Sequence, residues 1–186
     1  LSRGNILNIP EKAKFIKTSI QNKKKVSALL KQENFDILIH FAAYIDVEES
    51  MSNSKLYNNN NFLNTVKLID NCIKNNLTNI IFSSTAAIYG NNKSGVVSEN
   101  SRTKPVSPYA ISKLKSENYI RSKKKLNYII LRYFNVAGSD LKLRSGNISK
   151  RKSTHLIKKM CENYILNKET QIFGNNYNTS DGTAIR

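Results

Sequence analysis

The stretch that decides the fold is IIFSSTAAIYG (80–90), followed after a polar loop by SPYAISKLKSE (107–117). The first string begins as an apolar run, which is typical of a buried strand. That run ends in three hydroxyl side chains, Ser83, Ser84 and Thr85. The stretch therefore predicts a strand with a polar tip.

The second string predicts a helix that carries reactive side chains near its start. Ser107 is placed to cap the helix and Pro108 stands at its first position, which are both favoured choices there. Residues four apart on a helix are neighbours, so Tyr109 and Lys113 share a face. A hydroxyl cluster that faces such a pair can move a proton and a hydride.

The spacing Tyr-x-x-x-Lys carries little weight alone, because this chain has 9 tyrosines and is rich in lysine. It occurs in four pairs: Tyr89/Lys93, Tyr109/Lys113, Tyr119/Lys123 and Tyr164/Lys168. The first pair flanks a Gly-Asn-Asn turn signal, and the third runs into the solvated lysine run 123–125. The fourth has no hydroxyl-tipped strand before it. Context therefore selects the second pair.

The remaining pattern alternates strands and helices. Strands are predicted at 14–20, 35–42, 79–84 and 127–134, and helices at 23–32, 54–75, 108–124 and 155–166. Such alternation predicts an α/β fold, a doubly wound, Rossmann-like parallel sheet with helices on both faces. Ligands bind beyond the carboxyl ends of such strands, where 41–43, 83–85 and 133–135 fall.

The chain is expected to divide at residue 137. Residues 1–137 would form the α/β domain, which the resemblance to a known family implies is part of a dinucleotide-binding domain. Residues 138–186 begin with a polar, basic loop and would form the start of a smaller substrate-binding lobe.

Composition narrows the function classes. The net charge of +17 gathers in clusters such as 23–25, 123–125 and 150–152, which could be an anion-binding surface. No aromatic residues interleave with them, so solvated helix faces are the preferred interpretation and no nucleic-acid partner is expected. Apolar runs are too short to span a membrane. Cys72 and Cys161 are expected to be buried thiols in a reducing, cytoplasmic setting, and no metal-ligand spacing occurs.

Six strings resemble the extended short-chain dehydrogenase/reductase family in family order. They are HFAAYIDVEES, YNNNNFLNTVKLI, IIFSSTAAIYG, SPYAISKLKSE, ILRYFNVAGSD and IFGNNYNTSDGTAIR. Within the family they are most similar to the enzymes that epimerise UDP-hexoses at C4. The resemblance implies NAD as cofactor and a UDP-sugar substrate (UDP-glucose or UDP-galactose), with a hydride removed from C4 and returned through a 4-keto sugar.

The resemblance also implies roles for the selected pair. Tyr109 is the base that takes the 4-hydroxyl proton, Lys113 lowers its pKa and binds the nicotinamide ribose, and Thr85 orients the hydroxyl and relays the proton. A free tyrosine has a pKa near 10, so a nearby cation is needed to favour the phenolate. Ala86 and Ala87 stand where the family's 4,6-dehydratases carry Asp and Glu, which favours epimerisation. A dehydratase, a decarboxylase and a noncatalytic basic binding module remain as alternatives.

Further contacts are implied by motif position. The cofactor-binding set is Ile20, Phe41, Ala42, Ala43, Asn60, Ser83, Thr85, Tyr109, Lys113 and Phe134. The substrate-binding set is Thr85, Tyr109, Asn135, His155, Leu156, Phe173 and Arg186. Ser19 departs from the family's adenine-binding Asp. His40 is expected to be a satisfied core residue rather than a catalytic one.

No G-x-x-G-x-x-G turn, which would hold a pyrophosphate, occurs in the sequence. Residues 1–4 resemble the segment after the family's second strand, so the first βαβ portion and part of the sugar pocket are expected to be missing. The sheet would then have uncovered edges. We expect the chain alone to bind NAD weakly and to be inactive, and the full-length family member to be a homodimer.

Overall fold

The computed structural model describes residues 4–91, 95–142, 144, 146, 148, 155–172 and 174–183. Its internal contacts divide the chain into two units, one formed by residues 17–134 and the other by the described parts of 1–16 and 135–186. The use of the first unit for NAD and the second for substrate stays a prediction.

The centre of the first unit is a three-stranded parallel sheet, made of β1 (Leu38–His40), β2 (Asn79–Thr85) and β3 (Asn127–Tyr133) in that order. In the register of β2 and β3, Phe82 lies opposite Ile130 and Thr85 opposite Tyr133. The three carboxyl ends therefore lie along one edge. This arrangement confirms the predicted Rossmann-like α/β fold with parallel strands.

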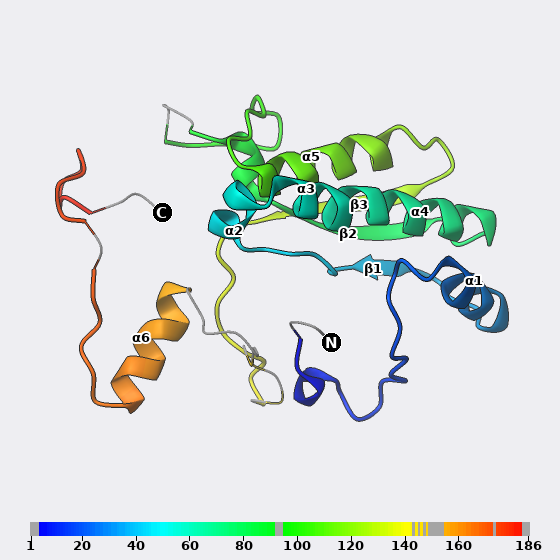
Figure 1. Ribbon diagram of the computed structural model, residues 1–186, viewed down its shortest axis with the longest axis horizontal. Coiled ribbons are helices and arrows are strands. Elements are labelled where there is room, and N and C mark those ends of the chain that lie inside the picture. Colours follow the sequence, from blue (N-terminus) through cyan, green and yellow to red (C-terminus); the bar gives the residue numbers. More distant parts are fainter. Residues whose placement is uncertain are drawn as a thin grey trace. The chain divides into compact units, whose positions relative to one another are not determined.

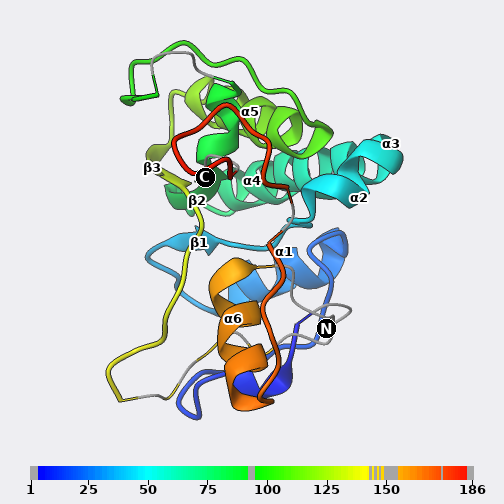
Figure 2. The same ribbon diagram turned by 90° about the vertical axis from the view of Figure 1, so that its left-hand side faces the viewer.

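Helices α4 (Asn64–Lys74) and α5 (Pro108–Arg121) cover one face of this sheet, as Figures 1 and 2 show. The core between them is aliphatic and aromatic, and consists of Ile69, Ile80, Phe82, Ile120 and Leu126. The shorter elements of the unit are α1 (Lys23–Gln32), α2 (Val47–Ser52), α3 (Ser54–Tyr57) and a 3-10 turn, η3 (Ala86–Tyr89). Helix α1 packs on α4 through Val26, which lies in a second core cluster with Leu68 and Cys72.

The predicted helix 54–75 is interrupted by a π-helical turn, η2 (Asn58–Leu63), between α3 and α4. The extra residue in a π turn rotates the positions that precede it, so the 3.6-residue periodicity fails there. Leu56 and Leu63, which are apolar, are exposed by 42% and 40%. The polar Asn61 is instead almost fully buried.

Two strand predictions are wrong. Residues 14–20 form no strand, and the predicted buried strand 35–42 is reduced to the three residues of β1. A strand exists only where a neighbour completes its hydrogen bonds, and among the described residues β1 pairs on one side only, with β2. Apolar side chains of this region are consequently exposed, Ile39 by 51% and Phe41 by 59%.

The second unit contains a short 3-10 turn, η1 (Ile6–Asn8), and helix α6 (Leu156–Ile165). This helix matches the predicted helix 155–166 within one residue at each end. Its apolar side chains are poorly covered, with Tyr164 exposed by 87% and Ile165 by 80%. Described residues from 172 onward form neither helix nor strand. None of the described helices is both long and apolar enough to cross a membrane.

Candidate active site

The first turn of α5 is built as the sequence predicts. The Ser107 hydroxyl accepts a hydrogen bond from the Ala110 amide at 3.2 Å, and Pro108 follows the cap. This cap fixes where the helix starts, and thus which side chains face the sheet. Tyr109 and Lys113 both point inward and are exposed by only 9% and 3%.

Two contacts place the predicted catalytic residues of α5 at the carboxyl end of β2. The Tyr109 phenol lies close enough to the Thr85 hydroxyl for this neighbour to lower its pKa. The Lys113 Nζ donates to the main-chain oxygen of Ser83 at 2.7 Å and lies 5.0 Å from the centre of the Phe82 ring. The structure therefore brings Thr85, Tyr109 and Lys113 together in one buried cluster.

Burial controls the proton affinities in this cluster. It lowers the pKa of Lys113 from its usual 10.5 to about 8. Burial also raises the pKa of the Tyr109 phenol, although the Thr85 hydroxyl acts in the opposite direction. Lys113 is not among the groups that shift the pKa of Tyr109 in this structure, where its ammonium donates to the Ser83 carbonyl.

His40 is a buried, neutral residue near Lys113 of the cluster. It is exposed by 4%, and its Nε2 lies 2.8 Å from the Thr65 hydroxyl. That hydroxyl gives its own proton to the Asn61 carbonyl at 2.7 Å, so Nε2 must be the donor to Thr65. Burial, and secondarily the charge of Lys113, lowers the pKa of His40 to about 4. The prediction of a satisfied core histidine is confirmed.

The π turn brings Asn61, rather than the predicted Asn60, into the interior. The Asn61 side-chain amide makes two hydrogen bonds with the main chain of Tyr44. It accepts one from the Tyr44 N–H at 2.8 Å and donates the other to the Tyr44 carbonyl at 2.9 Å. It also donates to the Ser112 hydroxyl of α5 at 3.3 Å. Asn60 lies half-buried beside it and donates to the Asn61 oxygen. Asn61 therefore ties the loop after β1 to α5, and nothing in a run of four asparagines singled it out.

Sequence reasoning also missed a buried ion pair next to the cluster. Glu117 of α5 is fully buried, and its carboxylate receives the Nη2 of Arg132 at 2.8 Å and the Nε at 3.2 and 3.3 Å. The same carboxylate accepts a hydrogen bond from the Ser84 hydroxyl. The available signal was the spacing, because Glu117 follows Lys113 by four residues and so shares its helix face.

The other predicted cofactor contacts lie around the strand ends. Phe41, Ala42 and Ala43 follow β1, and Phe134 follows β3 with 72% of its surface exposed. Ile20 is half-buried and packs against the Val26 cluster ahead of α1.

The predicted substrate contacts divide between the two units. Asn135, His155 and Leu156 belong to the second unit, while Phe173 and Arg186 lie outside the described residues. Neither unit therefore contains the whole predicted substrate set.

The three rejected Tyr-x-x-x-Lys pairs differ from the selected pair. Tyr119 donates to Asp70, which also pairs with Lys123 at 3.7 Å on a solvated surface. Tyr164 on α6 is largely exposed, and Lys93 lies outside the described residues. Among the residues described, no group of three or more His, Cys, Asp or Glu side chains could hold a metal ion.

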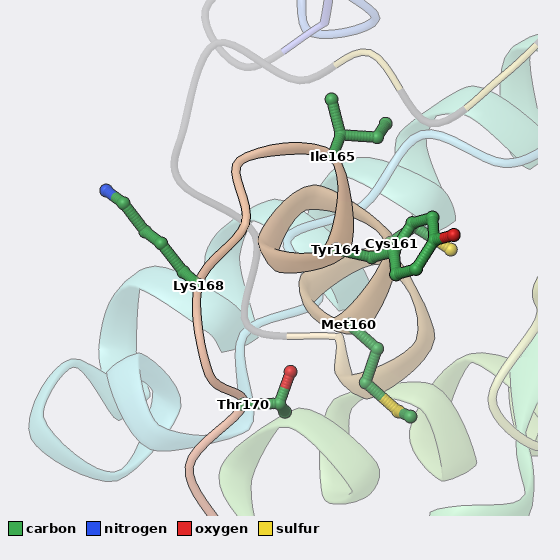
Figure 3. Close-up of a pocket in the computed structure, with 6 residues that line it drawn as sticks. All are labelled: Met160, Cys161, Tyr164, Ile165, Lys168 and Thr170. Atoms are coloured by element: carbon green, nitrogen blue, oxygen red, sulfur yellow. The ribbon is translucent and has the colours of Figure 1, made fainter.

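An apolar hollow of about 550 Å³ lies beside α6 and is lined by Met160, Cys161, Tyr164, Ile165, Lys168 and Thr170 (Figure 3). It contains none of the predicted site residues. Cys161 is exposed, so the prediction of two buried thiols is wrong for this residue and right for Cys72. The apolar positions of α6 are left open because little of the unit packs on them.

Comparison with known proteins identifies the family to which this fold belongs. The model of the NAD dependent epimerase/dehydratase family matches residues 2–186. The UDP-glucose 4-epimerase of Azospirillum brasilense is 36% identical over 190 residues, which cover 100% of this chain and 54% of the relative. The corresponding protein of Lactobacillus helveticus is 34% identical and is covered to 57%.

Comparison with solved structures points to the same family. A crystal structure of a UDP-glucose 4-epimerase superposes with a TM-score of 0.91 at 34% identity, over 100% of this chain and 57% of the other. The enzyme from Bifidobacterium longum, in complex with NAD+ and UDP, gives a TM-score of 0.82 at 30% identity, covering 89% and 51%. The chain belongs to the NAD dependent epimerase/dehydratase family. It spans about half the length of the relatives it matches.

Proposed function

We propose that the cluster of Thr85, Tyr109 and Lys113 is the catalytic part of an NAD-dependent 4-epimerase that acts on a UDP-hexose, UDP-glucose or UDP-galactose. The observation that carries this proposal is the buried cluster itself, in which Tyr109 lies at the Thr85 hydroxyl and Lys113 follows one helical turn away. Relatives named UDP-glucose 4-epimerase match the whole of this chain, which supports the choice of reaction.

The donor set of the cluster suits the ribose end of NAD. An ammonium has three N–H donors, and one of those of Lys113 goes to the Ser83 carbonyl. The others would donate to ribose hydroxyls, and the exposed residues after β1, Phe41 to Ala43, would line the cofactor. No Gly-rich turn for the pyrophosphate occurs among the 186 residues. When bound, NAD would supply the hydride acceptor and a positive charge that favours the phenolate.

In the forward half-reaction, Tyr109 would accept the proton of the sugar 4-hydroxyl as the C4 hydride leaves, which gives a 4-keto sugar. The Thr85 hydroxyl would hold the 4-oxygen and pass the proton to the phenolate oxygen. Lys113 would stabilise the phenolate by its charge. In the reverse half-reaction, Tyr109 would return the proton to the same oxygen once the sugar has presented its other face.

Elimination of water is disfavoured by the two residues next to Thr85. Ala86 and Ala87 begin η3, and methyl groups cannot transfer protons. The Glu117 carboxylate is close along α5, but it is fully buried and bound by Ser84 and Arg132. A 4,6-dehydratase would need an acid that reaches the sugar, and this side chain is already engaged.

The test joins these 186 residues to the flanking segments of the Azospirillum brasilense epimerase and assays UDP-glucose and UDP-N-acetylglucosamine, with products identified by NMR. We expect UDP-galactose from the first substrate. A 4,6-dehydrated or decarboxylated product would replace the proposal with one of its alternatives, and no conversion by a folded protein that binds NADH would overturn it. The homodimer implied by the family resemblance is a further prediction, which the sedimentation of the same protein tests.

A further inference from the structure

The contacts between α5 and β2 form a repeating series that extends beyond the predicted catalytic residues. Tyr109, Lys113 and Glu117 follow one another at intervals of four along one face of α5, and all three are buried. Each contacts a different residue at the end of β2. Tyr109 contacts Thr85, Lys113 contacts the Ser83 carbonyl, and Glu117 contacts the Ser84 hydroxyl.

Of these three contacts, the one made by Glu117 is fixed from several sides. Arg132 of β3, which is the register partner of Ser84, binds the carboxylate through Nε and Nη2. The other arm of the same guanidinium donates to the Tyr89 hydroxyl at 2.7 Å and to the Glu99 carbonyl at 2.9 Å. Glu117 is thus held by β2 and β3, and its partner is held by the segment that comes after β2.

Such a pair is better suited to setting geometry than to adding stability. Desolvation offsets most of the attraction in a buried ion pair, and apolar pairs of similar size are often as stable. A two-pronged guanidinium contact does fix direction, because both the distance and the plane of the carboxylate are set. Fixing Glu117 fixes the rotation and the height of α5 against β2.

We propose that Glu117 and Arg132 are positioning residues, which hold the Tyr109 phenol at Thr85 and the Lys113 ammonium at the Ser83 carbonyl. They touch neither substrate nor cofactor, and they act through the helix. The inference deepens the proposed function and rests on it, because positioning matters only if Tyr109 is the proton acceptor.

The experiment observes the phenol directly in the 186-residue chain, without NAD or sugar. Fluorotyrosine is incorporated at every tyrosine, and the fluorine NMR signal of residue 109 is assigned with Tyr109→Phe and titrated against pH. The test variants are Glu117→Gln, which keeps the size of the side chain, and the apolar pair Glu117→Leu with Arg132→Met. The matched control is Asp70→Asn, which removes a carboxylate that also binds a tyrosine and a cation.

Positioning predicts that the Tyr109 midpoint falls toward its ordinary value in the folded double variant, because burial is the largest cause of its raised pKa and outweighs the opposite effect of Thr85. A smaller fall is expected in Glu117→Gln, and none in Asp70→Asn. An unchanged midpoint in the folded double variant would overturn the inference. If only the Glu117→Gln variant folds, an unchanged Tyr109 midpoint in that variant would overturn the inference.

If neither variant folds, the pair is required for folding and the positioning role is refuted. Since neither NAD nor sugar is present, failure here leaves the proposed function to its own assay. A protein that fails to turn over UDP-glucose while the midpoint shifts would refute the function and not the geometry.

Discussion

Helix α5 carries one Tyr-x-x-x-Lys pair at its start, Tyr109 and Lys113, and a second that begins near its end, Tyr119 and Lys123. The first pair is buried under the carboxyl end of β2, and burial lowers the pKa of Lys113 to about 8. Lys123 is accessible to solvent, and its hydrogen bond with Tyr119 raises the pKa of Lys123. The same spacing therefore gives a buried amine with a lowered pKa in one place and a surface cation in the other.

The difference comes from the groups that face each pair. Tyr109 and Lys113 meet a strand end that presents a hydroxyl and a main-chain carbonyl, while Tyr119 and Lys123 meet the single carboxylate Asp70. Desolvation is the largest cause of the lowered pKa of Lys113, and the hydrogen bond with Tyr119 is the largest cause of the raised pKa of Lys123. Enzymes tune acids and bases by burial and by neighbours in this way.

The sharpest test of this contrast is activity. In the protein joined to the flanking epimerase segments, Tyr109→Phe is expected to lower turnover of UDP-glucose by about 10²–10⁴-fold, the usual contribution of a general base. Tyr119→Phe should leave turnover unchanged. Steady-state rates for both variants check this, and equal losses would show that the position on α5 does not matter.

The surroundings of the two Tyr-x-x-x-Lys pairs should also differ in how much they contribute to the free energy of unfolding. Glu117→Ala takes the carboxylate from the partly buried Arg132 guanidinium, which is expected to reduce the free energy of unfolding by about 2–4 kcal/mol. Asp70→Ala breaks a solvated pair and should cost about 1 kcal/mol or less. Urea unfolding followed by circular dichroism measures both, and a larger loss in the Asp70 variant would contradict the account.

Lys113 should destabilise the chain at neutral pH. Its folded pKa of about 8 lies below the unfolded 10.5, so the unfolded chain binds more protons between these values and stability rises with pH across them. Replacement by an apolar side chain removes the buried charge, so Lys113→Met is expected to stabilise the chain at pH 7 by about 1–3 kcal/mol.

The difference from the parent should shrink as the pH approaches about 9.5, because the parent then loses its buried charge. The difference in stability between Lys113→Met and the parent removes the contribution of other titrating groups, such as Cys72, because both proteins contain them. Unfolding curves at several pH values test the trend, and a gap that widened with pH would have the wrong sign.

The smallest expected contrast is in the caps. Ser107→Ala removes the buried N-cap of α5, at about 1 kcal/mol. Ser122→Ala removes an exposed hydroxyl that donates to the Tyr119 carbonyl and should change stability by about 0.5 kcal/mol or less. Thermal unfolding measures the loss of stability in each variant. A greater loss in Ser122→Ala than in Ser107→Ala would contradict the account.

The sequence predicted the parts of this structure that depend on local pattern. The apolar run before Ser83 became β2, and the Ser-Pro signal before Tyr109 became the start of α5. The alternation of strands and helices was enough to predict a parallel sheet, because few other arrangements bury such a pattern.

The features that the sequence could not supply depend on partners distant in the chain. Residues 14–20 have strand composition but no pairing strand among the described residues, and the π turn shifted the helix face toward Asn61. Arg132 reaches Glu117 only because β3 lies beside β2, which periodicity does not reveal. The partners of a buried charge therefore had to come from the structure.

The central claim is that burial beside β2, and not the Tyr-x-x-x-Lys spacing, lowers the pKa of Lys113. NMR titration of the 186-residue chain with isotope-labelled lysine side chains tests it most directly, with signals assigned by Lys113→Arg and Lys123→Arg. We predict that Lys113 titrates near pH 8 and Lys123 above its ordinary 10.5. Both lysines titrating together, or Lys123 titrating below Lys113, would contradict the account.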